Sequence, residues 1–200
     1  MRRIHVEGET CLSVKYGFND VVGKKVLITG DVGVGKTKLT IALLEEAVAL
    51  GLSAKITIID MAPATIYIQG RKIGGKLVEL SEKLSNVRYL TPQRVETPRL
   101  SAKSTRELLH LVDLNEKRIK SILKEFVESP TSILFVNDIS IYLQSGFDEP
   151  ILSVMRSSET FVANGYYGST LQSDFETRVS KTERRLMNKL ADTVDVVINL

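Results

Sequence analysis

The sequence contains few residues of the kinds that crosslink chains or bind zinc. It has one cysteine, Cys11, and two histidines, His5 and His110, and it has no tryptophan. A single cysteine cannot form an internal disulfide, and these three residues do not have the spacing of zinc ligands. A reducing compartment therefore suits the chain, and we assign structural roles to Cys11, His5 and His110.

The chain also lacks a large excess of charge and a long apolar run. Lys and Arg total 27 against 24 Asp and Glu, a net charge of +3, which does not by itself indicate a protein that coats nucleic acid or a membrane surface. Polar residues such as Glu7 and Glu9 interrupt the N-terminal segment, which therefore lacks the continuous apolar stretch of a signal peptide. No run approaches the roughly 18 apolar residues that span a bilayer. We expect a soluble, cytoplasmic protein without a membrane partner.

The pattern of apolar residues predicts an α/β fold. A chain of 200 residues with 43% hydrophobic content forms a sizeable core as one domain, residues 1–200. From Lys24 onward, short β-branched runs alternate with helical patterns, which predicts a mostly parallel β-sheet with helices on both faces. Residues 1–20 alternate around a turn at 7–10 and predict a short β-hairpin-like extension. Ser-x-x-Glu patterns at Ser104 and Ser180 predict two helix starts.

A glycine-rich segment lies between the first predicted strand of the main fold and its helix. It reads Gly30-Asp31-Val32-Gly33-Val34-Gly35-Lys36-Thr37 and fits G-x-x-x-x-G-K-[ST]. Such glycines let backbone N–H groups converge on phosphate oxygens, the lysine adds a point charge for the β- and γ-phosphates, and the threonine hydroxyl binds Mg²⁺. We predict that residues 30–37, together with Lys38, bind a nucleoside triphosphate.

On this motif the chain resembles the P-loop NTPase superfamily over about residues 20–200. The resemblance implies ATP and Mg²⁺ as ligands and an acidic residue after an apolar strand beside the metal. The run Ile133–Asp138 offers two registers. Either Asp138 is the metal ligand together with Thr37, which we favour, or Asn137 takes that position and Asp138 is the base that activates water. A loop-capping role for Asp138 is the third interpretation.

Two further residues at strand ends are candidates for catalysis beside Lys36 and Asp138. Asp60 ends the run ITIID, and Asp60-Met61-Ala62-Pro63 weakly resembles the Asp-x-Asp-Pro of polynucleotide 5′-hydroxyl kinases of RNA processing, with Ala62 in place of the second acid. Asn164 lies at the end of a later strand, TFVANG, near where many hydrolytic P-loop proteins keep a polar sensor that contacts the γ-phosphate or the attacking water. Turn formation is the structural alternative for both residues.

A group of basic residues recurs at helix-neighbour spacing near the C-terminus, namely Arg178, Lys181, Arg184, Arg185 and Lys189. It predicts an arginine finger, a lid over phosphates, or a nucleic-acid contact, and its structural alternative is a solvated helix face. Tyr166 and Tyr167 precede it and either pack or stack on a ligand.

Three functions are consistent with this sequence. We favour Mg²⁺-dependent ATP hydrolysis. ATP is preferred to GTP because the stretch 188–192 does not match the guanine-binding Asn-Lys-x-Asp signature. The alternatives are a small kinase whose acceptor pocket forms from residues 61–75 and 91–103, and a nucleotide-binding regulatory module with negligible hydrolysis. A homo-oligomer or a protein partner fits each of the three, and the sequence does not decide between them.

Overall fold

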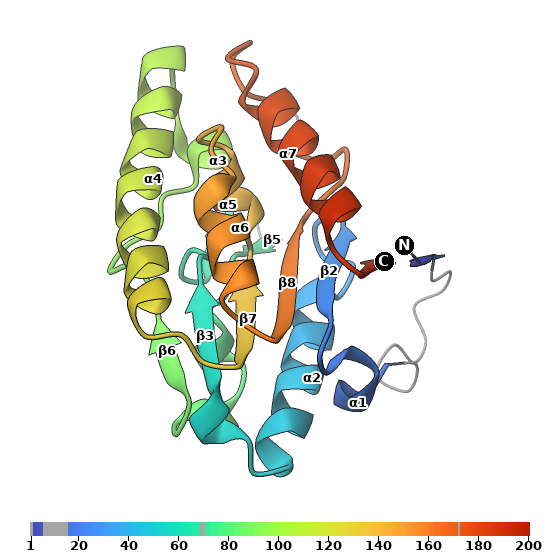
Figure 1. Cartoon of the computed structure of the whole chain (residues 1–200). Helices are drawn as coiled ribbons and strands as arrows, with labels where there is room; N and C mark the ends of the chain where they lie inside the picture. The colour runs from blue at the N-terminus through green and yellow to red at the C-terminus, as the bar shows by residue number, and fades with distance from the viewer. Residues whose placement is uncertain (1, 6–15, 69–70, 172) are drawn as a thin grey trace.

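The computed structural model describes residues 2–5, 16–68, 71–171 and 173–200, and its main feature is one parallel β-sheet (Figure 1). Seven strands pair in the order β1-β9-β2-β8-β7-β3-β6, and every pairing is parallel. A separate antiparallel pair, β4 and β5, lies between β3 and β6 in the chain. The strands are β1 (Arg2–His5), β2 (Lys25–Gly30), β3 (Ile56–Asp60), β4 (Ile66–Ile68), β5 (Arg71–Ile73), β6 (Arg88–Leu90), β7 (Ile133–Asn137), β8 (Thr160–Tyr166) and β9 (Val196–Asn199).

Helices cover both faces of the sheet, as the sequence pattern predicts. They are α1 (Phe18–Val21), α2 (Lys36–Ala49), α3 (Pro98–Ser101), α4 (Thr105–Glu128), α5 (Ser140–Leu143), α6 (Glu149–Arg156) and α7 (Val179–Thr193), with the short 3₁₀ turns η2 (Ser53–Lys55), η3 (Leu77–Glu79) and η4 (Glu82–Leu84). Within the described residues, none of the helices is long and apolar enough to cross a membrane.

Alternate residues of the central strands pack into two separate apolar cores. Leu27 of β2 packs with α4, α5, α6 and α7, whereas its neighbours Val26 and Ile28 pack with α1 and α2. The same alternation holds in β7, where Leu134 joins the first core and Phe135 the second. Strands buried on both faces need helices on both faces, so this alternation explains the layered α/β architecture.

The N-terminal strand corrects one prediction. Arg2–His5 is not part of a separate extension, because β1 pairs in parallel with β9 at the edge of the main sheet. A hairpin partner would instead be antiparallel. The predicted turn at 7–10 and the second strand after it lie outside the described residues, as does Cys11.

The two predicted helix starts have different outcomes. Ser104 is the N-cap of α4, and its hydroxyl accepts a hydrogen bond from the Glu107 N–H at 3.2 Å. The second prediction is wrong, because α7 starts after Arg178 and Ser180 lies inside the helix. Glu183 does not turn back to the helix start, since its carboxylate pairs with Arg99 at 2.9 Å. A tertiary ion pair therefore replaces the local capping contact.

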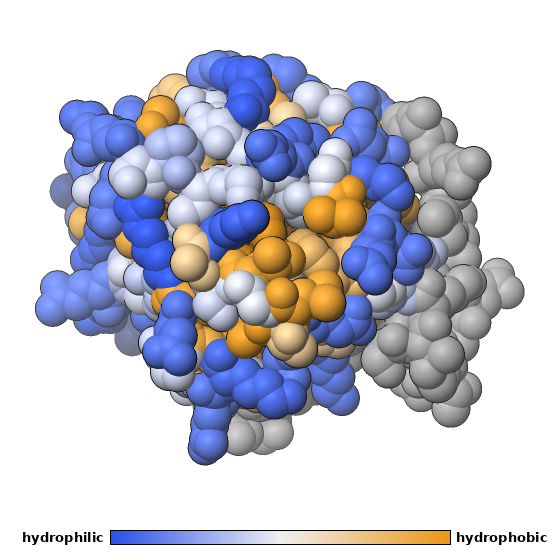
Figure 2. All heavy atoms as spheres, turned by 60° about the horizontal axis from the view of Figure 1, so that its bottom comes forward, coloured by the Kyte–Doolittle hydropathy of each residue, from blue (hydrophilic) through white to orange (hydrophobic). Residues whose placement is uncertain are grey.

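The end of the molecule opposite the carboxyl edge of the sheet has apolar side chains on its surface. Figure 2 shows that apolar side chains gather near the middle of this face, with hydrophilic side chains around them. Leu50 follows α2 and Val22 follows α1, and both are exposed. The polar residues that the sequence predicts as functional lie instead at the carboxyl ends of the strands.

Phe135 tests the packing of the second core. Its side chain is fully buried and stacks on Phe18 with 6.5 Å between ring centroids. We expect Phe135→Ala to lower the free energy of unfolding by about 3–5 kcal/mol, because it leaves a cavity. Urea unfolding measures this, with the half-exposed Val127→Ala as control. A loss no larger than that of the control would contradict the packing described.

Candidate functional site

The glycine-rich loop lies at the carboxyl edge of the sheet, between β2 and α2, as the motif requires. Gly30 has φ of 153°, and a Cβ there would come within 2.7 Å of the Leu200 carbonyl oxygen. Gly35, the N-cap of α2, has φ of 101°, in the left-handed region. A side chain at either position would be strained, so the close backbone curve of the loop depends on these two glycines.

The loop presents the start of α2 without a side-chain cap. Gly35 has no side chain to accept the first-turn N–H groups of the helix, which leaves them available to an anion, with the helix dipole in support. Lys36 is half-buried, and its Nζ donates to the Asp31 carbonyl oxygen at 2.6 Å. Burial lowers the pKa of Lys36, while Asp138 and Asp31 raise it. The loop thus offers backbone donors, a lysine and the Thr37 hydroxyl, a donor set that fits Mg²⁺ and a triphosphate.

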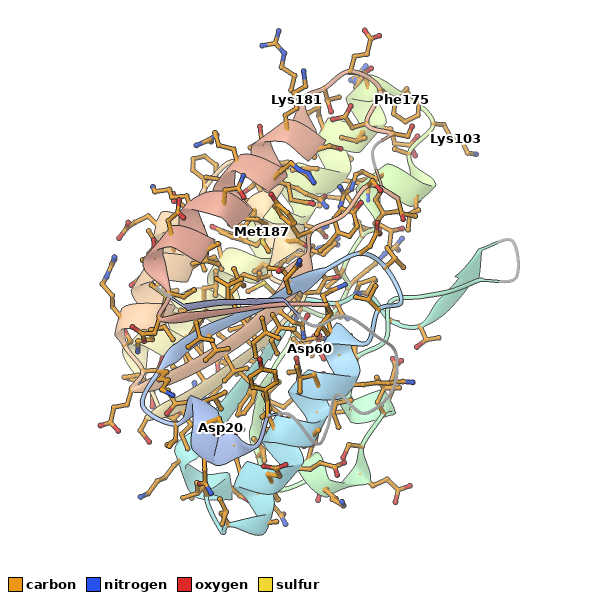
Figure 3. The ribbon with its side chains drawn as sticks, turned by 90° about the vertical axis from the view of Figure 1, so that its right-hand side faces the viewer. Asp20, Asp60, Lys103, Phe175, Lys181 and Met187 are labelled. Carbon is orange, nitrogen blue, oxygen red and sulfur yellow. The ribbon has the colours of Figure 1, made fainter. Side chains whose placement is uncertain are left out.

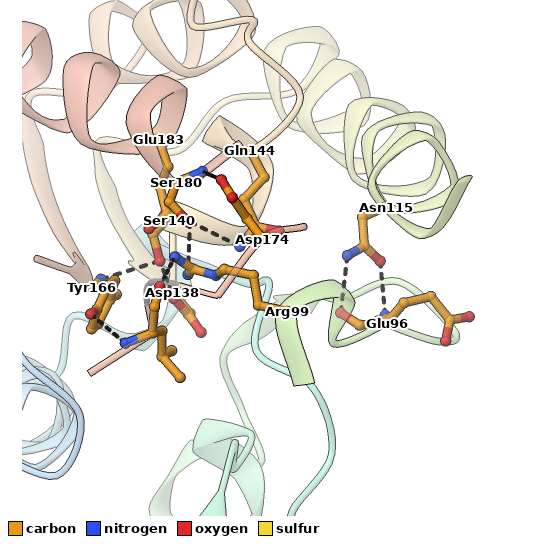
Figure 4. Close-up of polar contacts among 11 residues, drawn as sticks. Glu96, Arg99, Asn115, Asp138, Ser140, Gln144, Tyr166, Asp174, Ser180 and Glu183 are labelled. Carbon is orange, nitrogen blue, oxygen red and sulfur yellow. Dashed lines mark hydrogen bonds and ion pairs between the residues drawn. The ribbon is translucent and has the colours of Figure 1, made fainter. Parts of the chain in front are cut away.

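Asp138 follows β7 directly and is bonded on both its backbone and its side chain. Its φ of 56° is left-handed. Its N–H donates to Asn164 Oδ1 at 3.0 Å. Its Oδ1 accepts from the Ser140 hydroxyl at 2.7 Å, and Figure 4 labels both of these residues. Burial raises the pKa of the Asp138 carboxyl, and the Ser140 hydrogen bond and the charges of Lys36 and Arg99 oppose this. Asp138 and Lys36 therefore interact across the carboxyl edge.

A chain of buried side-chain hydrogen bonds connects α2 to three strands below this edge. Asn164 Nδ2 donates to Thr40 Oγ1 and to Asn137 Oδ1, both at 2.9 Å. Asn137 Nδ2 donates to Asp60 Oδ1 at 2.9 Å. The amide atoms of Asn164 are thus bonded within the protein, and they orient the backbone of Asp138.

Asp60 lies at the inner end of this chain, inside the fold (Figure 3). Its carboxylate accepts hydrogen bonds from the N–H groups of Ala62 and Leu77 at 3.0 and 2.7 Å, and from the Tyr89 hydroxyl. Burial raises the pKa of Asp60, although these bonds and the one from Asn137 lower it. Asp60 is fully buried, so its carboxylate contacts other groups of the protein and is not exposed at the surface of the site.

Arg99 is a residue of the site that no sequence pattern indicates. It lies in α3, and its guanidinium donates to the Leu171 carbonyl oxygen and pairs with Glu183, each at 2.9 Å. The group lies 5.1 Å from the Tyr166 ring centroid. Figure 4 shows Arg99 reaching between Asp138 and Glu183. These partners are distant in sequence, and the stretch around Arg99 has no periodicity, so only the fold reveals the cluster.

Asp31 attaches the loop after β8 to the glycine-rich loop of residues 30–37. Its Oδ2 accepts hydrogen bonds from the N–H groups of Ser169 and Thr170 at 2.9 and 3.2 Å. Desolvation opposes ionisation, but the hydrogen bonds from Ser169, Thr170 and Val32 prevail and lower the pKa of Asp31 to about 2. The charged Asp31 carboxylate therefore holds the loop after β8 in place, and Asp31 is also a member of the predicted nucleotide site.

Only part of the predicted basic face surrounds a pocket. Arg178, Lys181 and Arg184 line it, whereas Lys189 pairs with Asp148 at 2.6 Å. The Arg184 guanidinium lies 4.5 Å from the Tyr167 ring centroid. Within the described part of the chain, no group of three or more His, Cys, Asp and Glu residues is arranged to hold a metal.

A small cavity of about 70 Å³ lies beside Asp138. Its walls come from the two segments that the sequence predicts as an acceptor pocket, through Pro63 and Gly74 on one side and residues 97–100 on the other. Gln144 and Leu171 complete it. A liquid water molecule occupies about 30 Å³, so the cavity has room for water.

The comparisons with known proteins support no assignment to a family. No protein-family model and no curated protein matches the chain. One similar solved structure is described as a prototypical ATPase from the type III secretion system of pathogenic bacteria. The match covers 90% of this chain and 51% of that one, at 11% identity and a TM-score of 0.36. The chain spans about half the length of that structure, and so weak a similarity transfers neither residues nor activity.

Asp60→Ala tests the buried hydrogen-bond chain. It leaves the donors of Asn137, Tyr89 and Leu77 without an acceptor, and we expect the free energy of unfolding to fall by about 3 kcal/mol or more. Urea unfolding measures this, with the exposed Asp20→Ala as control. Unchanged stability would show that the carboxylate of Asp60 is not needed by these donors.

The Glu183 carboxyl predicts a pH dependence of stability. Burial and the charge of Asp138 raise its pKa from 4.5 to about 7, against the effects of Arg99 and Gln144. The folded protein then binds this proton more tightly than the unfolded chain, so this contribution to stability falls as the pH rises from 4.5 to about 7. Glu183→Gln should flatten the stability profile over that window in urea titrations. Parallel profiles of the two proteins would contradict the shift.

Proposed function

We propose that the protein binds Mg²⁺-ATP at residues 30–38 and hydrolyses it. The proposal is supported by the open start of α2, the Lys36 ammonium within the loop, and the half-buried Asp138 carboxyl that interacts with Lys36. These groups meet at the carboxyl edge of a parallel sheet, where ligands bind in open α/β folds.

Each residue has a role that follows from its chemistry. Lys36 leaves the Asp31 carbonyl oxygen and pairs with the β- and γ-phosphates, and the first-turn amides of α2 bind the same oxygens. Thr37 and Asp138 would hold the metal. Bound Mg²⁺ neutralises charge on the phosphate oxygens. Asp60 and Asn164 contribute as positioning residues, because Asn164 bonds the Asp138 N–H and Asp60 bonds Asn137.

The cavity beside Asp138 is the observation that favours hydrolysis over transfer to a hydroxyl acceptor. At about 70 Å³ it has room for an attacking water, whereas a kinase needs space for its acceptor at the same place. The experiment is phosphate release from Mg²⁺-ATP by the purified protein beside Lys36→Ala. Turnover that is lost in the variant supports the proposal, and equal turnover in both proteins would end it.

Lys36→Ala should weaken Mg²⁺-ATP binding by roughly tenfold to a hundredfold, because a charge-assisted contact with phosphate is worth about 1.5–3 kcal/mol. Isothermal titration calorimetry measures the dissociation constant. Lys55→Ala, which removes an exposed lysine after α2, is the control and should bind as the parent does. Unchanged affinity in Lys36→Ala would remove the phosphate loop from nucleotide binding.

Asp138→Asn should affect the reaction more than binding. The amide keeps the size of the side chain but loses the charge that orients the metal and water, so we expect kcat to fall by about 10²-fold or more while the ATP dissociation constant changes by less than about tenfold. Asp113→Asn in α4 is a charge-matched control. Equal turnover in Asp138→Asn and the parent protein would exclude Asp138 from the chemistry.

A further inference from the structure

A second, larger pocket lies beside the start of α7, and we call it the α7 pocket. Its volume is about 540 Å³, within the range of small-molecule sites. None of residues 30–37 lines it. The lining residues come from α3, the end of β8, the loop that follows and the first turns of α7: Arg99, Tyr166, Tyr167, Gly168, Leu171, Asp174, Glu176, Arg178, Ser180, Lys181, Glu183 and Arg184. The pocket is therefore distinct from the phosphate loop.

The charges around the α7 pocket favour an anionic ligand. Arg99 and Glu183 pair with each other and are buried. Asp174 uses its carboxylate to accept the Ser180 N–H at 2.9 Å. In contrast, among the described residues no carboxylate forms an ion pair with Arg178, Lys181 or Arg184. Three cations thus surround the pocket without a carboxylate bonded to them, although the exposed Glu176 also lines it.

A buried hydroxyl adds a directional group to these cations. Ser180 Oγ is inaccessible to solvent and has no hydrogen-bond partner within the described structure, although Ser180 lines the pocket. Buried polar atoms are normally paired, and because Ser180 lines the pocket, rotation of its side chain toward the pocket would let the hydroxyl donate to a ligand oxygen. Figure 4 shows Ser180 close to Glu183 and Asp174.

We propose that the α7 pocket binds the phosphate monoester of a second ligand, separate from the nucleotide at the phosphate loop. Arg178, Lys181 and Arg184 neutralise the phosphate, and Ser180 donates to one of its oxygens. A phosphate monoester matches this set because it combines two negative charges with several acceptor oxygens. Lys181 lies at the outer end of α7 (Figure 3), where the phosphate of a small molecule or the 5′ end of a nucleic-acid strand can reach it.

The pocket is also connected to the proposed catalytic site. Arg99 and Leu171 line both the α7 pocket and the small cavity beside Asp138. Asp31 of the phosphate loop holds Ser169 and Thr170, which continue directly into the pocket wall. A ligand in the α7 pocket therefore contacts the segment that the phosphate loop positions.

The test measures binding rather than turnover. Ribose 5-phosphate and 5′-phosphorylated tetrathymidylate are titrated by calorimetry, with ribose and unphosphorylated tetrathymidylate as controls. The phosphate loop is saturated with Mg²⁺ and a non-hydrolysable ATP analogue, and the titration is repeated in Lys36→Ala. A failure of nucleotide binding is then distinguishable from a failure of the α7 pocket. We expect saturable binding of one phosphorylated probe in both backgrounds, at least about tenfold tighter than its unphosphorylated control.

Two double variants locate the binding. Lys181→Ala/Arg184→Ala removes two cations of the pocket and should weaken the bound probe about tenfold or more. Arg185→Ala/Lys189→Ala removes the same charge from the same helix outside the pocket and should have less than about a twofold effect. Equal weakening by both, or no saturable binding of either phosphorylated probe, overturns the proposal.

Ser180→Ala distinguishes a loss of ligand contact from a loss of folding, because stability and affinity are measured on the same variant. It loses no internal hydrogen bond, so the variant should be at least as stable as the parent in urea unfolding, while its affinity for the probe falls about fivefold. Unchanged affinity in this stable variant would show that the hydroxyl does not contact the ligand.

Discussion

The geometry of the site depends on one run of buried hydrogen bonds, from Thr40 through Asn164 and Asn137 to Asp60. Each member lies on a different element, namely α2, β8, β7 and β3. A buried amide or carboxylate that loses its partner costs free energy of desolvation, so the four elements are held in one register at their carboxyl ends. The phosphate loop and Asp138 are built on these ends.

This arrangement separates residues that hold the site from residues that face a ligand. The side chains of Asp60 and Asn164 form their hydrogen bonds with other groups inside the protein. Lys36 instead bonds only a loop carbonyl in its described contacts, and Asp138 bonds Ser140 and lies beside a cavity. The left-handed backbone of Asp138, supported by Asn164, directs its carboxyl to that edge. Strain in the backbone is thus offset by the hydrogen bonds beneath it.

Ion pairs and hydrogen bonds around the loop after β8 connect the two cavities. Asp31 fixes the start of this loop, and Arg99 fixes its middle through the Leu171 carbonyl oxygen. Arg99 also holds α7 through Glu183. A buried ion pair is costly to form and costly to break, so α7 is placed firmly against the site. The loop is in contact with both the proposed nucleotide site and the α7 pocket.

Local chemistry let the sequence predict the parallel α/β fold, the position of the glycine-rich loop between β2 and α2, and the N-cap at Ser104. Apolar periodicity, glycine content and capping act over a few residues, so they are visible in the chain. The sequence pattern also placed Asp138 directly after a strand, whereas Asn164, which we expected at the end of its strand, lies inside β8. The pattern left open what the side chains of both residues contact.

The tertiary structure decided what depends on contacts between distant segments. It made Arg2–His5 an edge strand, buried Asp60 beneath four donors, brought Arg99 to Glu183, and divided the basic face of α7 between a pocket and the pair with Asp148. The direction of a side chain is set by the packing of the whole sheet and its helices, and no local pattern contains that information. The sequence by itself therefore determined the glycine-rich loop between β2 and α2, while only the fold decided which residues surround it.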